Sequence, residues 1–227
     1  MPRSARYNKR SGQGDADRLS VLITTLTEER KTPKMSQENK NKLAKIVRGA
    51  AIPPTFVLVL SVLMYLLKPS VFRGFFDLVV MLFTLAICPA LAYPLAKILP
   101  HYKCKGRAGS RSLAFLTSAV GYVIGTLYAF LSGASDDLKF IFTGYLIALV
   151  ALTVLNRLCK RKASGHACGI VGPLLYTVYY FGPFFFIPCA LIAALVVWAS
   201  IYRKSHTPGE LFLGSLCALT GFFSALL

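Results

Sequence analysis

The chain has 227 residues, is 55% hydrophobic and carries a formal net charge of +17. Leu, Ala, Val, Ile and Phe form runs too long for a soluble core, because an apolar run of about 18 or more uncharged residues is typical of a membrane-spanning helix. Composition therefore excludes a soluble globular protein.

Residues 1–48 are polar and hold 12 of the 26 Lys and Arg residues. Their one apolar stretch, "LSVLITTL" at 19–26, is too short to span a membrane. We expect a basic, mostly disordered cytoplasmic tail that leaves room for one surface helix. The first 50 residues contain no apolar core of a signal peptide.

Residues 49–227 are predicted to form an all-α, polytopic transmembrane bundle of seven spans, or six if one run is re-entrant. The seven apolar runs are 51–67, 75–96, 112–134, 140–156, 165–181, 183–202 and 209–227. The fifth and sixth form one uncharged stretch, and "FGPFF" at 181–185 supplies the turn between them. Gly121 and Gly125 predict close helix packing within the monomer.

The gaps between these runs alternate in charge. The second, fourth and sixth are basic: "KILPHYKCKGRAGSR", "RLCKRKASGH" and "RKSHTPGE". Because Lys and Arg gather in cytoplasmic loops, we expect a multi-pass protein with a cytoplasmic N-terminus and its basic gaps on the cytoplasmic face. The same rule accounts for the positive charge without a nucleic-acid partner.

The three histidines, His101, His166 and His206, all lie in the basic gaps. Ser164 is a natural N-cap for the helix that His166 opens, and a helix N-terminus with free N–H groups binds anions. A purely structural interpretation also explains this stretch: Ser164 caps the helix, Gly165 allows tight helix packing, and His166 lies at the membrane interface.

The sixth gap ends in "HTPGEL". Thr207, Pro208 and Glu210 fit a capping box, which explains Glu210 without chemistry. It does not explain His206. A histidine held by a carboxylate is the base–orienter pair of nucleophilic catalysis, and such an imidazole can attack phosphorus.

These stretches resemble the type-2 phosphatidic acid phosphatase superfamily, the lipid phosphate phosphatases, with this chain as a divergent member. The family pattern is Lys-x6-Arg-Pro, then Pro-Ser-Gly-His, then Ser-Arg-x5-His-x3-Asp. Residues 155–214 carry the resemblance. Ala163-Ser164-Gly165-His166 matches the second part, and Ala199-Ser200 with His206 and Glu210 matches the third.

The resemblance implies a hydrolase that needs neither metal nor cofactor. His206 would be the nucleophile that forms a phosphohistidine, Glu210 would orient it, and His166 would protonate the leaving alcohol. Ser164 and the Gly165 backbone would hold phosphate oxygens. The substrate implied is a lipid phosphate or polyprenyl diphosphate in the bilayer, and we expect the active site on the cytoplasmic face.

The chain departs from the pattern in its arginines. Ser200 stands in place of the third part's arginine, and no Arg-Pro dipeptide exists. The cations that could replace them around a phosphate are Lys160, Lys162, Arg203, Arg107 and Arg111.

Two other functions fit the sequence. One is a catalytically degenerate relative that binds anionic lipid or scaffolds a membrane partner. The other is a small transporter subunit, which the near-absence of ionisable residues within the apolar runs disfavours. The six cysteines contain no C-x-x-C pair, which argues against a zinc site or a disulfide framework.

Overall fold

The computed structural model describes residues 36–227, with the side chain of Arg107 outside the description. The chain divides into two units, Met1–Lys42 and Leu43–Leu227, and the second contains the site described below. The apolar stretch at 19–26 lies outside the described residues.

Residues 36–227 form helices and no strands, which confirms the all-α prediction for this part of the chain. The helices are α2 (Gln37–Ala50), α3 (Pro53–Leu67), α4 (Phe75–Leu82), α5 (Cys88–Ile98), α6 (Pro100–Lys103), α7 (Gly106–Leu131), α8 (Asp136–Thr153), α9 (Gly165–Phe181), α10 (Phe186–Tyr202) and α11 (Pro208–Leu226). Two π-helical turns, η2 (Phe83–Ile87) and η3 (Val154–Leu158), join α4 to α5 and prolong α8. Two 3₁₀ turns are η1 (Pro69–Val71) and η4 (Pro183–Phe185).

The length and apolar composition of the described helices indicate a membrane protein. Five helical stretches are long and apolar enough to cross a bilayer: Phe75–Ile98, Ala108–Leu131, Asp136–Leu158, Pro183–Tyr202 and Pro208–Leu226. A sixth results if α2 and α3, which meet at a sharp bend, form one span. With 15 and 17 residues, α3 and α9 are shorter than a typical span of about 20. Seven spans therefore stay a prediction.

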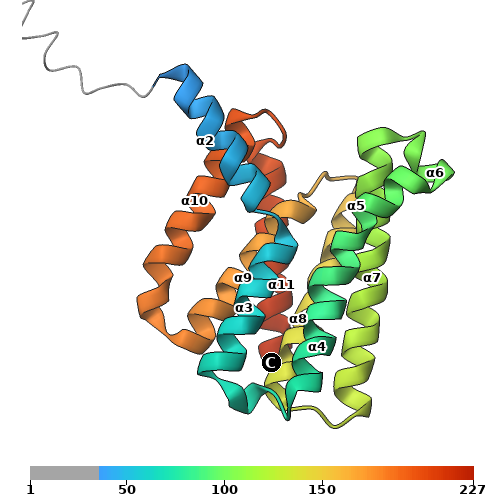
Figure 1. Cartoon of the computed structure of the whole chain (residues 1–227), viewed down its shortest axis with the longest axis vertical. Coiled ribbons are helices and arrows are strands. Elements are labelled where there is room, and N and C mark those ends of the chain that lie inside the picture. Colours follow the sequence, from blue (N-terminus) through green and yellow to red (C-terminus); the bar gives the residue numbers. More distant parts are fainter. Residues whose placement is uncertain (1–35) are drawn as a thin grey trace, which may run out of the picture. The chain divides into compact units, whose positions relative to one another are not determined.

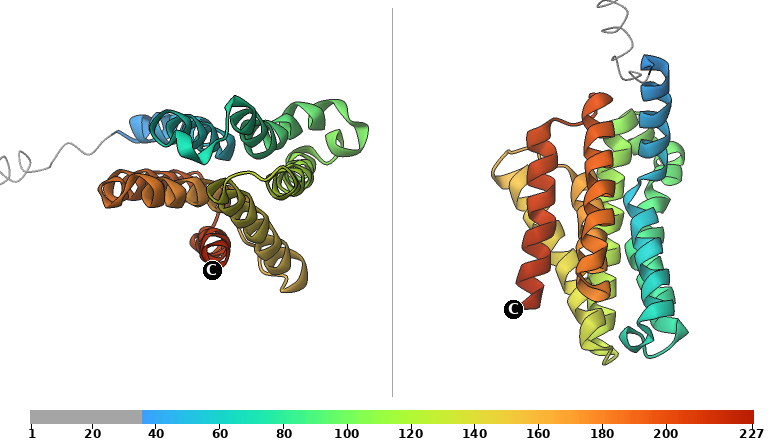
Figure 2. Two further views of the ribbon diagram at one scale, coloured as in Figure 1. Left: turned by 90° about the horizontal axis from the view of Figure 1, so that it is seen from below. Right: turned by 90° about the vertical axis from the view of Figure 1, so that its left-hand side faces the viewer.

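The helices of the second unit run side by side (Figures 1 and 2). The connections from α5 to α7, α8 to α9 and α10 to α11 lie at one end, and the intervening connections lie at the other (Figure 1). The three basic gaps are therefore gathered at one end, where the site is found. Which end faces the cytoplasm stays a prediction.

Glycines let α7 approach its neighbours closely. A Cβ atom on Gly121 would lie 2.3 Å from the carbonyl oxygen of Thr84, and one on Gly125 would lie 2.2 Å from the ring of Phe142. Both glycines thus pack within the monomer, as the sequence predicts.

The one acidic residue inside an early apolar run holds the end opposite the site together. Asp77 is 2% exposed. Its Oδ1 accepts hydrogen bonds from Arg73 Nη2 at 2.8 Å and from the Tyr128 hydroxyl at 2.5 Å. A buried carboxylate needs such partners, and these contacts tie α4 to α7.

Candidate functional site

The start of α9 forms the first wall of the site. Ser164 is buried and is the N-cap, because its Oγ accepts a hydrogen bond from the Ala167 N–H at 3.2 Å. Asn156 holds the preceding loop: its Oδ1 accepts from the Ala163 N–H at 3.0 Å, and its Nδ2 donates to the Ala163 carbonyl at 3.3 Å. Gly165 and His166 follow in the first turn with a fixed direction.

The start of α11 forms the second wall. Thr207 is the N-cap and accepts a hydrogen bond from the Glu210 N–H at 3.2 Å. The carboxylate of Glu210 turns elsewhere: its Oε2 lies 3.0 Å from His206 Nδ1, and its Oε1 lies 3.0 Å from Lys162 Nζ. A capping role alone does not account for where this carboxylate points.

The two helix starts are joined directly. The Ser164 N–H donates a hydrogen bond to the Glu210 carbonyl at 2.9 Å. A Cβ atom on Gly214 would lie 2.2 Å from the Ser164 carbonyl oxygen. A glycine is therefore required at position 214 for α9 and α11 to meet this closely.

The joined helices bring two histidines together. The rings of His166 and His206 stack with their centroids 6.3 Å apart and their planes 9° from parallel. One phosphoryl group can contact both imidazoles, given a reach of about 3 Å on each side. His101 is not part of this pair: it is exposed on α6, with its Nε2 2.9 Å from Lys105 Nζ.

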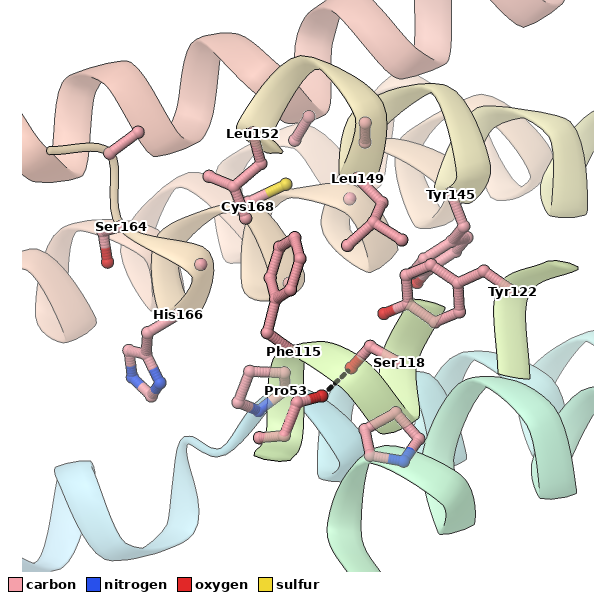
Figure 3. A pocket seen from close by; sticks show the side chains of 18 of the residues that line it. Pro53, Phe115, Ser118, Tyr122, Tyr145, Leu149, Leu152, Ser164, His166 and Cys168 are labelled. Atoms are coloured by element: carbon pink, nitrogen blue, oxygen red, sulfur yellow. Dashed lines mark hydrogen bonds between the residues drawn. The ribbon is translucent and has the colours of Figure 1, made fainter. Parts of the chain in front are cut away.

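A cavity of about 400 Å³ opens beside the histidines. Its mouth is polar and includes Arg48, Arg111, Lys162, His166 and His206. The cavity continues between the helices to aromatic residues; Ser164 and His166 lie at one end, and Tyr122 and Tyr145 at the other (Figure 3).

The candidate phosphate-binding residues divide between the cavity and the surface. Ser164, Gly165, Lys162 and Arg111 line the cavity. Lys160 and Arg203 are exposed and lie outside the lining. Lys160 has a left-handed backbone conformation with φ of 52°, and Arg203 is the C-cap of α10. Both residues therefore belong to exposed connections and not to the cavity wall. Arg107 lies in the first turn of α7, and its side chain is outside the described part of the structure.

Arg48 is a site residue that sequence reasoning missed. It lies on α2, lines the cavity, and its Nη1 donates a hydrogen bond to the Ser205 hydroxyl in the α10–α11 connection. From the sequence, Arg48 is assigned to the basic tail of residues 1–48, although it lies close to the start of the first apolar run at residue 51. That adjacency is the only local signal for its role.

The surroundings of His206 favour a neutral imidazole. Burial lowers its pKa below the usual range, and the cations Arg111 and Arg48 lower the pKa further. The hydrogen bond to Glu210 opposes this shift without reversing it. Because a carboxylate only accepts hydrogen bonds, Nδ1 carries the proton and Nε2 keeps its lone pair.

His166 offers a second free ring nitrogen. Its Nε2 is buried and has no hydrogen-bond partner among the described residues. Buried polar groups without partners are rare in native proteins, and this residue lines the cavity. A ligand with hydrogen-bonding oxygen atoms would satisfy it.

No known protein family, curated protein or solved structure matches this chain.

Proposed function

We propose that the chain is an integral membrane phosphatase that hydrolyses a lipid phosphate or a polyprenyl diphosphate through a phosphohistidine intermediate. One observation carries this proposal: His166 and His206, 40 residues apart in sequence, stack 6.3 Å apart at the mouth of a cavity that runs between apolar helices. Glu210 holds His206 in the orientation that a nucleophile needs.

In the first half-reaction, His206 Nε2 attacks phosphorus and the bond from phosphorus to the leaving oxygen breaks. His166 gives its proton to that oxygen. The negative charge of the bound phosphoryl group favours the protonated form of His166. Glu210 stabilises the positive charge that develops on His206.

In the second half-reaction, a water molecule attacks the phosphohistidine. His166, now neutral, takes a proton from the water, and the bond between phosphorus and Nε2 breaks. Orthophosphate leaves, and His206 and His166 return to their starting protonation states. No redox step occurs and none of the steps requires a metal ion.

Positive charge around the phosphate supplies most of the acceleration in phosphoryl transfer. Losing one such donor raises the barrier by roughly 3–4 kcal/mol, which is the cost expected from serine at position 200. Arg48 and Arg111 line the cavity mouth, and the first turn of α9 adds backbone N–H groups. In this proposal Arg48 replaces the missing arginine.

The proposed topology has seven passes, a cytoplasmic N-terminus and the site at the cytoplasmic boundary. With 17 residues, α9 reaches the lower limit of about 17 for a span. With 15 residues, α3 counts as a span only where the bilayer is locally thinned. The lipid phosphate would come from the inner leaflet.

A degenerate relative that binds anionic lipid or scaffolds a membrane partner without turnover is the second candidate. The ion pair of Lys162 with Glu210 favours it, because this contact draws on the carboxylate that His206 needs. The side chain of Lys162 is 75% exposed, so solvent screens this pair and weakens the objection.

The test is phosphate release by detergent-purified protein from a panel of lipid phosphates and polyprenyl diphosphates, with a metal chelator present. His206→Ala and His166→Ala should each abolish release. His101→Ala is the matched control, since this histidine is exposed and outside the cavity, and it should keep full activity. Full turnover by the His206 variant contradicts the nucleophile assignment. Binding of anionic lipid without release supports the degenerate relative instead.

A further inference from the structure

We infer that the substrate has a single hydrocarbon chain, and that this chain is held inside the helical bundle rather than left in the surrounding lipid. The inference deepens the proposed phosphatase function and rests on it. It comes from the depth, volume and closed floor of the cavity that begins at the two histidines.

The cavity wall changes from polar to apolar below the mouth. Phe115, Leu149 and Leu152 line its middle section between Ser164 and the tyrosines (Figure 3). A headgroup anion fits the cationic mouth, and a hydrocarbon chain fits the apolar section. The order of these surfaces matches one amphiphile that enters with its tail downward.

Aromatic rings close the floor. Tyr145 packs edge-on against Tyr122 with ring centroids 5.4 Å apart, and it stacks on Tyr176 at 5.9 Å. Phe222 also packs against Tyr176, with ring centroids 5.2 Å apart. These rings come from α7, α8, α9 and α11.

Three helices place this floor at the same depth. Tyr122 follows Arg111 by 11 residues on α7, Tyr176 follows His166 by 10 residues on α9, and Tyr145 precedes Asn156 by 11 residues along α8 and η3. At about 1.5 Å per residue, each floor ring lies roughly 15–17 Å along its helix from Arg111, His166 or Asn156, which line the other part of the cavity. The agreement defines one cavity of limited length.

Depth and volume both limit the size of the bound chain. An extended chain with carbon–carbon bonds of about 1.5 Å fills a depth of roughly 15 Å with about a dozen atoms. A cavity of about 400 Å³ lies at the small end of the usual range for ligand pockets, roughly 300–1,000 Å³. A lipid with two long acyl chains exceeds this capacity.

The cavity also has a side that meets the lipid. Tyr93 on α5 is 49% exposed and lines the cavity as well. Pro53 and Pro54 of α3 line the same cavity. A chain dissolved in the membrane can pass sideways between α3 and α5 past Tyr93, with its phosphate at the mouth throughout.

Gly172 offers a way to shorten the cavity. It lines the cavity six residues after His166, or roughly 9 Å deeper along α9. A Cβ atom there would meet only the Tyr145 ring and hydroxyl, at an ordinary contact distance of 3.9 Å. Gly172→Leu should therefore fold and block the lower part. Ala194→Leu is the matched control, because Ala194 is exposed on α10 and outside the lining.

The experiment measures phosphate release from hexyl phosphate, dodecyl phosphate, an isoprenyl phosphate of similar length and dioleoyl phosphatidate, at equal mole fractions in mixed micelles. Wild type should turn over the longer single-chain substrates at least about tenfold faster than the phosphatidate. Gly172→Leu should lower turnover of dodecyl phosphate at least about tenfold and change that of hexyl phosphate less than about twofold, since only the longer chain loses buried methylene groups. Ala194→Leu should change neither. The dodecyl and isoprenyl arms distinguish a fatty chain from an isoprenoid one.

Two results would overturn the single-chain inference alone: phosphatidate hydrolysed as fast as dodecyl phosphate, or a Gly172→Leu variant whose effect is the same for both chain lengths. Release from no substrate at all would overturn the phosphatase proposal and the inference with it. Because the tip of hexyl phosphate ends at about the depth of the substituted position and its chain does not extend below it, its turnover also shows whether the variant is folded.

Discussion

At the scale of single residues, Glu210 has two competing explanations, capping and catalysis. Its backbone N–H is capped by Thr207, while its carboxylate bonds His206 and Lys162. Glu and Gln serve a capping box equally well, so a glutamine at this position keeps the cap and removes the charge. The two explanations therefore predict different outcomes for one substitution.

Glu210→Gln should lower kcat by roughly two to four orders of magnitude, because a neutral amide neither fixes the tautomer of His206 nor stabilises its developing charge. The melting temperature in detergent should stay within about two degrees of wild type. Steady-state kinetics and thermal unfolding measure the two quantities. A variant with wild-type kcat would leave Glu210 with the capping role alone.

The environment of His206 also sets a pH dependence. A nucleophilic His206 must be neutral, and its lowered pKa keeps it neutral until the pH falls below the ordinary histidine value of about 6.5. The groups that act on it are Glu210, which raises its pKa, and Arg111 and Arg48, which lower it. The stacked ring of His166 faces it as well.

We expect kcat/KM to fall on the acid side only below about pH 6.5, as His206 gains a proton and loses its lone pair. In Glu210→Gln the acid limb should move to still lower pH, because the group that raises the pKa of His206 is gone. A pH–rate profile of both proteins measures this. An acid limb centred above pH 7 would rule out His206 as the group that titrates.

At the scale of elements, the site depends on two helix starts held in contact. Ser164 and Glu210 share a backbone hydrogen bond, and Gly214 leaves no room for a side chain against the Ser164 carbonyl. The positions of both histidines follow from this contact. Gly209 lies on the same helix, and a Cβ atom there would meet nothing within 4 Å, so it provides a matched comparison.

Gly214→Ala should destabilise the protein by about 1–3 kcal/mol, because the added methyl group forces α9 and α11 apart, and it should lower phosphate release. Gly209→Ala should leave both quantities unchanged or raise stability slightly, since alanine favours a helix over glycine. Thermal unfolding in detergent and phosphate release test the pair. Equal behaviour of the two variants would show that the close contact does not position the site.

Most of the helices and their N-caps could be predicted from the sequence. Each apolar run became a helix, and Ser164 and Thr207 cap α9 and α11 because capping depends on local hydrogen bonds. The contact between helix starts could not be predicted, since it depends on how distant segments cross. For the same reason Arg48 was missed and His101, although in a basic gap, lies apart from the other two histidines.

At the scale of the whole molecule, the proposed topology places the basic connections and the site on the cytoplasmic side. Two native cysteines report on this: Cys104 and Cys159 are exposed and lie within the second and fourth gaps, directly after α6 and η3. The other four cysteines are buried or half-buried.

A membrane-impermeant maleimide should label Cys104 and Cys159 in inside-out vesicles and leave them unlabelled in sealed right-side-out vesicles. Charge bias in the short loops is the physical reason for this orientation. Cys104→Ser/Cys159→Ser is the control and should remove the signal. Labelling from the outside alone would invert the proposed topology and place the site on the opposite leaflet.

In the proposed mechanism His206 becomes covalently phosphorylated during turnover. The direct measurement is an alkaline quench of the purified protein with substrate carrying radioactive phosphate, followed by mapping of the labelled peptide. We expect an acid-labile, alkali-stable label on His206 that disappears in His206→Ala and remains in His101→Ala. Continued phosphate release with no label on His206, or with label on another residue, would contradict it.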